Sequence, residues 1–216
     1  MTDGDRVRAL LPGDDARTHG ERLPGEIARA LDKAEVTRGD IDLLAVATGP
    51  GAFTGLRIGL AAMQGLAMTL NKPVIGVSAL DALAEQVADS DLDFIVPWMD
   101  AQRGDVFATL IDRRSGVTIE MPSAANPQAL LDQWHAHLAR RRAVFIGDAA
   151  MRDGALIAFA GKGEWESRQP APLAPQIAII GRRHADRGEP GRPHALTPIY
   201  VRRPDAEIER ERRSRG

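Results

Sequence analysis

The fold of this chain is decided by one stretch, Thr48-Gly49-Pro50-Gly51-Ala52-Phe53-Thr54-Gly55-Leu56-Arg57. It follows an apolar run over residues 41–47, typical of a buried strand, and precedes a helical pattern over residues 54–70. A glycine-rich turn between a strand and the amino end of a helix presents backbone N–H groups to an anion. The residues of this turn that fit a phosphate-binding role are Gly49, Gly51, Thr54 and Gly55.

The spacing of these glycines matches neither of the two common phosphate-binding loops. The P-loop pattern needs a lysine after its last glycine, but Gly55 is followed by Leu56. The dinucleotide-binding pattern places two residues between its second and third glycines, whereas three separate Gly51 from Gly55. A purely structural role also fits, because glycine adopts positive φ and permits close packing in a tight turn. The sequence leaves a phosphate loop and a structural turn equally open.

The helix predicted over residues 54–70 mixes large and small side chains. One broad apolar face carries Leu56, Leu60, Met63, Leu66 and Leu70. The small residues are Gly59, Ala62, Gly65 and Ala67. Glycine inside a helix costs about 1 kcal/mol relative to alanine, so its presence indicates a packing reason. Two reasons are open: close contact with the protein's own sheet, or close contact with a helix of another subunit.

The rest of the chain alternates strands and helices. Thr18 and Glu21 match a capping box, and a helix is predicted over residues 18–36, in which Pro24 should either kink the helix or delay its start. The other predicted elements are an edge strand over 6–11, a strand over 74–77, a hairpin of 94–99 with 105–111, a helix over 126–140, a strand over 144–147 and a helix over 176–187. This order favours an α/β fold with a mixed sheet and helices on its faces.

Composition narrows the function classes. The 216 residues include 44% hydrophobic ones, enough for a core, and no cysteine, which excludes thiolate metal sites and a cysteine nucleophile. The formal charge of −2 gives no global attraction to RNA or membranes, and no apolar run approaches the ~18 residues of a membrane helix. A reducing cytoplasm fits these features. Arginine runs at 140–142 and within 202–213 leave direct RNA binding open, although Glu207, Glu209 and Glu211 favour a solvated tail for the second run.

Four segments in order carry a family resemblance. They are 49–59, Lys72-Pro73-Val74-Ile75-Gly76-Val77-Ser78, Asp100-Ala101-Gln102-Arg103-Gly104-Asp105-Val106-Phe107, and Pro198-Ile199-Tyr200-Val201-Arg202-Arg203-Pro204-Asp205-Ala206-Glu207. Together with His19 and Leu23-Pro24 they resemble the TsaB family of bacterial tRNA threonylcarbamoyladenosine biosynthesis proteins. The resemblance spans residues 19–207 and is far more specific than a glycine motif alone.

The resemblance implies an actin-like/RNase H-like α/β fold of two related subdomains. We expect an N-terminal subdomain over residues 1–95, truncated but carrying the glycine loop and the interface helices, and a C-terminal subdomain with the tail over residues 96–216. Family members open with an apolar strand, a polar turn and a second strand, whereas this chain begins at about the second strand. We therefore expect the first strand to be missing, and favour a start codon assigned too late over a truncation or a lineage that lost the strand.

The resemblance also implies a role without catalysis. Members of the family are scaffold subunits that activate the catalytic paralogue TsaD through their first two helices, and the ATPase TsaE docks on the pair. Homodimers through the same helices are also expected, tRNA is reached indirectly through the complex, and neither a cofactor nor a membrane is involved. The interface residues expected here are Leu23, Ile27, Leu31, Arg57, Leu60, Met63 and Gly65.

Histidine placement argues against catalysis. By the same resemblance, catalytic paralogues carry two histidines at i and i+4 on the helix after the strand that follows the glycine loop, on one face where they can bind a metal. The matching positions here are Ala79 and Leu83, and His135 and His137 are two apart, so no metal site and no catalytic residue is expected. Asp81, Asp100 and Asp105 are expected to be cap, turn or surface residues. The alternative is a nucleotide-dependent transferase or metallopeptidase-like enzyme using the glycine loop, which would bind ATP or a metal by itself.

Overall fold

A computed structural model describes residues 1–13, 19–87, 92–162 and 164–201. The chain forms two compact units: unit 1 is Met1–Glu85 with Ala171–Ile199, and unit 2 is Gln86–Pro170 with Tyr200–Gly216. The expected division after residue 95 assigned all later residues to the second subdomain, whereas residues 171–199 belong to unit 1. That return has a packing reason, because Ile177 and Ile180 share a core with Ile75 and Val77.

Unit 1 is built on two parallel strands. In chain order it contains β1 (Thr2–Asp3), β2 (Arg6–Val7), α1 (His19–Ala34), η1 (Arg38–Asp40), β3 (Leu44–Gly49), α2 (Phe53–Leu70), β4 (Val74–Ser78), α3 (Ala79–Ala84), α7 (Ala174–Asp186) and η2 (Pro193–Ala195). β3 pairs with β4 from Leu44↔Val74 to Ala47↔Val77. The predicted edge strand over 6–11 is instead a two-residue strand, β2, paired antiparallel with β1.

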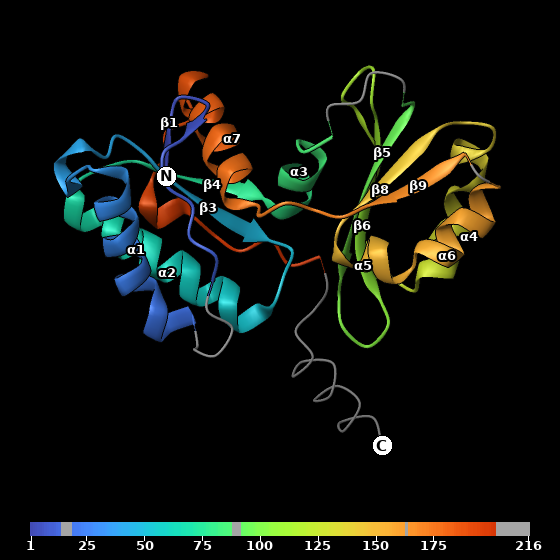
Figure 1. The fold of residues 1–216 in the computed structure, drawn as a ribbon, viewed down its shortest axis with the longest axis horizontal. Helices are drawn as coiled ribbons and strands as arrows, with labels where there is room; N and C mark the ends of the chain where they lie inside the picture. The colour runs from blue at the N-terminus through green and yellow to red at the C-terminus, as the bar shows by residue number, and fades with distance from the viewer. Residues whose placement is uncertain (14–18, 88–91, 163, 202–216) are drawn as a thin grey trace. The chain divides into compact units, whose positions relative to one another are not determined.

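The helices of unit 1 cover both faces of the β3–β4 pair, with α7 on one face and α1 and α2 on the other (Figure 1). Side chains alternate along a strand, so Ala45 and Val77 face α7, where a Cβ on Gly181 would lie 2.7 Å from the Ala45 Cβ. Gly76 faces the opposite way, toward Thr48 and Leu196. Pro24 lies inside α1, as predicted, while Thr18 lies outside the described residues.

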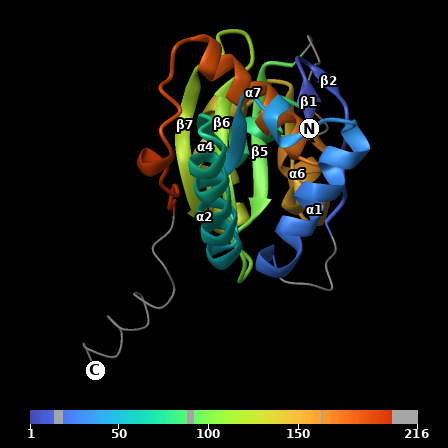
Figure 2. The same cartoon turned by 90° about the vertical axis from the view of Figure 1, so that its left-hand side faces the viewer.

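Unit 2 is a five-stranded mixed sheet with helices. Its elements are β5 (Phe94–Asp100), β6 (Val106–Asp112), β7 (Thr118–Ala125), α4 (Pro127–Leu138), β8 (Ala143–Ile146), α5 (Asp148–Arg152), α6 (Gly154–Gly161) and β9 (Trp165–Arg168). The strand order is β7-β6-β5-β8-β9, with β5, β6 and β7 antiparallel and β8 parallel to β5 and β9. Figure 2 shows β5, β6 and β7 side by side. The predicted hairpin is confirmed as β5–β6.

The three tryptophans of this aromatic-poor chain gather in the core of unit 2. Trp98 meets Trp134 and Phe145 edge-on, with ring centroids 6.2 and 5.3 Å apart. Trp98 and Trp165 also satisfy their indole N–H groups, the first on Asp153 Oδ2 at 2.9 Å and the second on the carbonyl of Leu138 at 3.3 Å. Edge-to-face rings add about 0.5–1.5 kcal/mol per pair to their burial, so this cluster anchors the sheet to its helices.

Candidate functional site

The glycine loop joins β3 to the amino end of α2. Gly49 has a φ of 116°, and the peptide bond to Pro50 is cis. α2 begins at Phe53, and its first turn holds no acidic side chain. Ala52 occupies the N-cap position and its side chain makes no capping hydrogen bond. The first backbone N–H groups of α2 are therefore not capped by the N-cap side chain.

The chain's own C-terminal segment lies against this loop. The amide of Ile199 donates to the carbonyl of Thr48 at 2.7 Å. A Cβ on Gly49 would lie 2.8 Å from the Ile199 carbonyl oxygen and 3.1 Å from Leu56 Cδ2. Gly49 is therefore required both by its positive φ and by the close approach of residue 199. A Cβ on Gly51 would meet nothing within 4 Å, so its own surroundings do not require that glycine.

Helix α2 presents a face of small and apolar residues to solvent. Phe53, Arg57, Ala61, Gly65 and Met68 are all exposed and recur every three or four residues, with Met68 72% exposed. The Arg57 guanidinium lies 3.9 Å from the centroid of the Phe53 ring. Leu60 and Ala67 point inward and are buried. This spacing gives α2 one face for the core of unit 1 and another that is exposed.

The two glycines inside α2 have open space beside them. A Cβ on Gly59 or on Gly65 would meet no heavy atom of the described chain within 4 Å. Contact with the protein's own sheet therefore does not explain either glycine. By contrast, a Cβ on Gly181, in α7, would lie only 2.7 Å from the Ala45 Cβ.

The residues expected at a partner interface fall into three groups. Arg57 and Gly65 are exposed, and Leu23, Ile27 and Met63 are half-buried. Leu31 and Leu60 are buried, at 7% and 4% exposure, and so pack within unit 1. α1 and α2 lie against each other (Figure 1), so the buried pair can support the face that the other residues form.

The positions that would carry metal-binding histidines are closed. Ala79 and Leu83 lie on α3 with 3% and 2% exposure. Among the described residues no three His, Asp, Glu or Cys side chains are placed to hold a metal ion. His137 and His184 instead lie beside Glu120 and Glu189, at 3.3 and 3.2 Å.

The aspartates have local roles. Asp81 stands in the first turn of α3, where its amide donates to Ser78 Oγ, and burial raises the pKa of its carboxyl. Asp100 ends β5, and Asp105 begins the return to β6.

The described helices include none long and apolar enough to cross a membrane.

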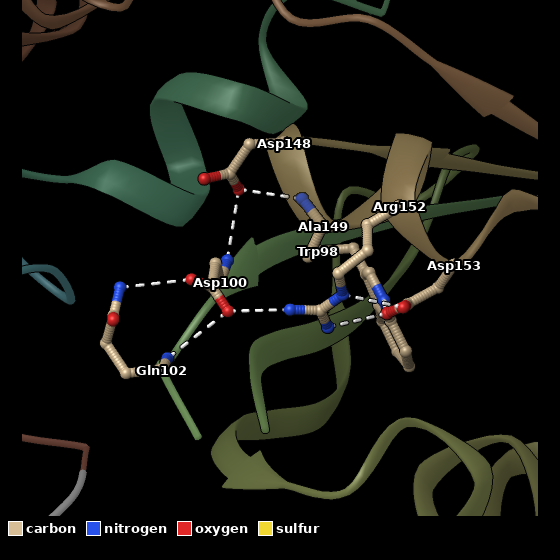
Figure 3. A network of polar contacts seen from close by, with 7 residues as sticks. All are labelled: Trp98, Asp100, Gln102, Asp148, Ala149, Arg152 and Asp153. Atoms are coloured by element: carbon tan, nitrogen blue, oxygen red, sulfur yellow. Dashed lines mark hydrogen bonds and ion pairs between the residues drawn. The ribbon is translucent and has the colours of Figure 1, made fainter. Parts of the chain in front are cut away.

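Unit 2 holds a polar network that sequence reasoning missed (Figure 3). Arg152 at the end of α5 donates from Nη1 to Asp100 Oδ1 at 2.7 Å, and from Nε and Nη2 to Asp153 at 2.8 and 2.9 Å. Asp148 Oδ1 accepts from the amide of Asp100 at 3.0 Å. Burial alone would raise the pKa of Asp153, but hydrogen bonds from Arg152 and Trp98 hold it below its usual value. Only the fold brings these residues together, so local patterns could not reveal them.

Comparisons with known proteins agree on one family. A family model described as "TsaD: tRNA N6-adenosine threonylcarbamoyltransferase" matches residues 7–126. An uncharacterized protein of Mycobacterium tuberculosis is 32% identical over 94% of this chain and 82% of its own length. The tRNA threonylcarbamoyladenosine biosynthesis protein TsaB of Bacillus subtilis is 28% identical over 88% of this chain and 82% of its own length.

Two solved structures show the same fold. A Pseudomonas aeruginosa protein described as similar to the peptidase YeaZ matches with a TM-score of 0.68 and 24% identity, over 86% of this chain and 85% of its own. The structure of YeaZ from the same species gives a TM-score of 0.64, over 84% and 85% of the two chains. The expected actin-like α/β class is thereby confirmed. The chain belongs to the TsaD-related family of tRNA threonylcarbamoyladenosine biosynthesis proteins, in its TsaB branch.

Proposed function

We propose that this chain, which belongs to the pathway of tRNA threonylcarbamoyladenosine formation, is a non-catalytic scaffold subunit that activates the catalytic paralogue TsaD. In this proposal α1 and α2 form the pairing surface, and the ATPase TsaE docks on the resulting pair in the cytoplasm. A homodimer through the same helices would compete with that pairing.

The observation that carries the proposal is the open space around Gly59 and Gly65. Each glycine costs about 1 kcal/mol of helix stability, which nothing inside unit 1 offsets. Without a Cβ, a helix of another subunit can bring its backbone close to α2, and the gain then appears only in the complex. Phe53 and Met68, exposed at the two ends of the face that carries Gly65, would supply apolar contacts around that glycine.

The absence of catalysis rests on the chemistry of α3. Alanine and leucine at positions 79 and 83 cannot ligate a metal, and both are buried in the chain itself. A scaffold of this kind would need no cofactor of its own. The competing function, an independent transferase or metallopeptidase-like enzyme, requires ATP or metal binding by the isolated chain.

Size-exclusion co-elution with TsaD from the same organism tests the proposal, using Gly65→Arg beside the wild type. The variant should fold normally because position 65 is exposed and open, but its charged side chain should block close approach. Ala136→Arg is the matched control, since it also places arginine at an exposed small residue of a helix, in unit 2. Loss of the complex with Gly65→Arg alone supports the proposal. No complex from folded wild-type protein, or equal pairing by both variants, overturns it.

A further inference from the structure

Arginines gather at one end of the unit 2 sheet, where the proposed function does not use them. Asp93, just before β5, connects two loops there. Its carbonyl accepts from the amide of Arg113 at 2.8 Å, and its own amide donates to the carbonyl of Arg142 at 2.9 Å. The turn after β6 and the connection from α4 to β8 therefore lie on either side of β5, at the same end of the sheet. They are about 10 Å apart, since two strand spacings separate β6 from β8.

Both loops carry exposed arginines. Arg114 comes from the turn after β6, and Arg140, Arg141 and Arg142 come from the connection after α4; all four are exposed. We call these four residues the arginine cluster. Arg113 is half-buried, with its Nε enclosed by the protein, and is not counted among them.

Two acidic groups lie beside the cluster and offset part of its charge. Asp93 accepts from Arg141 Nη1 at 3.3 Å and from the amide of Arg142 at 3.0 Å. Asp112 accepts from the amide and the hydroxyl of Ser115 at 2.8 and 2.7 Å, and these bonds hold its pKa below the usual value.

The other charged residues near the arginine cluster change its net positive charge little. Lys162 and Glu164, in the adjoining turn before β9, offset each other, and Glu120 lies beside His137. Asp89 and Asp91 precede this end of β5 in the sequence and lie outside the described residues. Among the described residues, the two loops thus carry more positive than negative charge on a chain whose formal charge is −2.

The backbone at Arg140 points to a role for its side chain. Its φ is 59°, the left-handed conformation that follows many helices and that usually falls to glycine. An L-residue with a Cβ costs about 1–2 kcal/mol there. The dipole of α4 favours a cation at this end of the helix and accounts for one charge, but Arg114 comes from a β-turn and gains nothing from it.

We propose that the arginine cluster binds the phosphate backbone of tRNA. Guanidinium groups bind phosphate through paired N–H donors, and two loops about 10 Å apart can contact more than one phosphate of a strand. The inference rests on the proposed function, since the pairing with TsaD brings tRNA to this chain. It adds that the scaffold itself holds the substrate, through contacts that carry no sequence information.

Binding of an unmodified tRNA transcript to the complex of this chain with TsaD tests the proposal, with fluorescence anisotropy measured over a series of salt concentrations. The test variant is Arg114→Glu/Arg140→Glu. The control, Arg38→Glu/Arg187→Glu, makes the same change in net charge at exposed positions of unit 1. We expect about tenfold weaker binding by the test variant alone, and a salt dependence shallower by about two logarithmic slope units.

Pairing with TsaD is measured on the same samples, which separates this inference from the proposed function. If wild-type chain and TsaD do not pair, the proposed function fails, and the same variants are compared on the isolated chain. Equal tRNA binding by wild type and test variant overturns the inference, as does equal weakening by test and control variants. Weaker pairing of the test variant with TsaD, with the tRNA affinity of the remaining complex unchanged, would assign the cluster to an acidic protein surface instead and overturn the RNA assignment.

Discussion

Replacing Gly65 by alanine should stabilise the isolated chain and weaken its pairing. The new Cβ meets nothing within 4 Å, and the hydrogen bond from Thr69 Oγ1 to the Gly65 carbonyl is kept. The helix then gains the full propensity difference, about 0.5–1 kcal/mol in the free energy of unfolding. For a chain of this size each 1 kcal/mol raises Tm by about 2–4 °C.

Two measurements check both halves of this prediction. Urea denaturation followed by circular dichroism gives the free energy of unfolding of the isolated chain, and calorimetric titration with TsaD gives the affinity. Gly181→Ala is the control, because its Cβ would lie 2.7 Å from the Ala45 Cβ and should destabilise by about 1–3 kcal/mol. If Gly65→Ala fails to stabilise, the α2 face is not open. If it stabilises and pairing is unchanged, the glycine does not serve a partner.

Three further predictions concern the loop, the tail and the polar network. Gly49→Ala should destabilise by about 2 kcal/mol, because an alanine there is strained at φ 116° and meets the Ile199 carbonyl, whereas Gly51→Ala should be neutral; thermal unfolding of both variants distinguishes these outcomes. Gln64→Ala removes the donor to the carbonyls of Pro193 and Leu196, at 2.9 and 3.0 Å, so hydrogen exchange of residues 193–199 should accelerate; unchanged exchange would mean that Gln64 does not hold this segment. Because the pKa of Asp153 is lowered in the folded state, its ion pair should stabilise the chain above the unfolded pKa of about 3.9 and lose that effect as pH falls through the lower folded value. Denaturation between pH 6 and pH 2 should show a smaller acid loss in Asp153→Asn, and identical pH profiles would contradict this assignment.

Sequence periodicity predicted the elements with strong local signals. The predicted strand over 74–77 is β4, and the hairpin over 94–99 and 105–111 is β5–β6. The helix over 126–140 is α4, whose N-cap Asn126 accepts from the amide of Gln128 at 3.0 Å. In each case the sequence pattern that marks the element lies within a few residues of the chain, which is why a single sequence predicts it, although the strands then pair with more distant segments.

The elements missed from the sequence lack such signals. β7 is an edge strand with Pro122 inside it, and β9 is four residues long with two charges. α6 is apolar on every side and bounded by glycines, so it has no amphipathic pattern. Residues 161–175 are rich in glycine and proline, as loops are, although Trp165 within them is buried in the core of unit 2. Packing against neighbouring elements, not local propensity, forms these segments.

By itself the sequence determined the α/β class, the family and the glycine turn, because motifs and periodicities are properties of short segments. Only the tertiary structure decided three features. These are the open space at Gly59 and Gly65, the contact of Ile199 with Gly49, and the position of Arg114 at the same end of the sheet as residues 140–142. Each depends on what lies next to a residue in space, and those neighbours come from segments far away in the chain. The sequence alone does not distinguish a glycine that prevents a clash with the protein's own backbone from one that leaves room for another subunit.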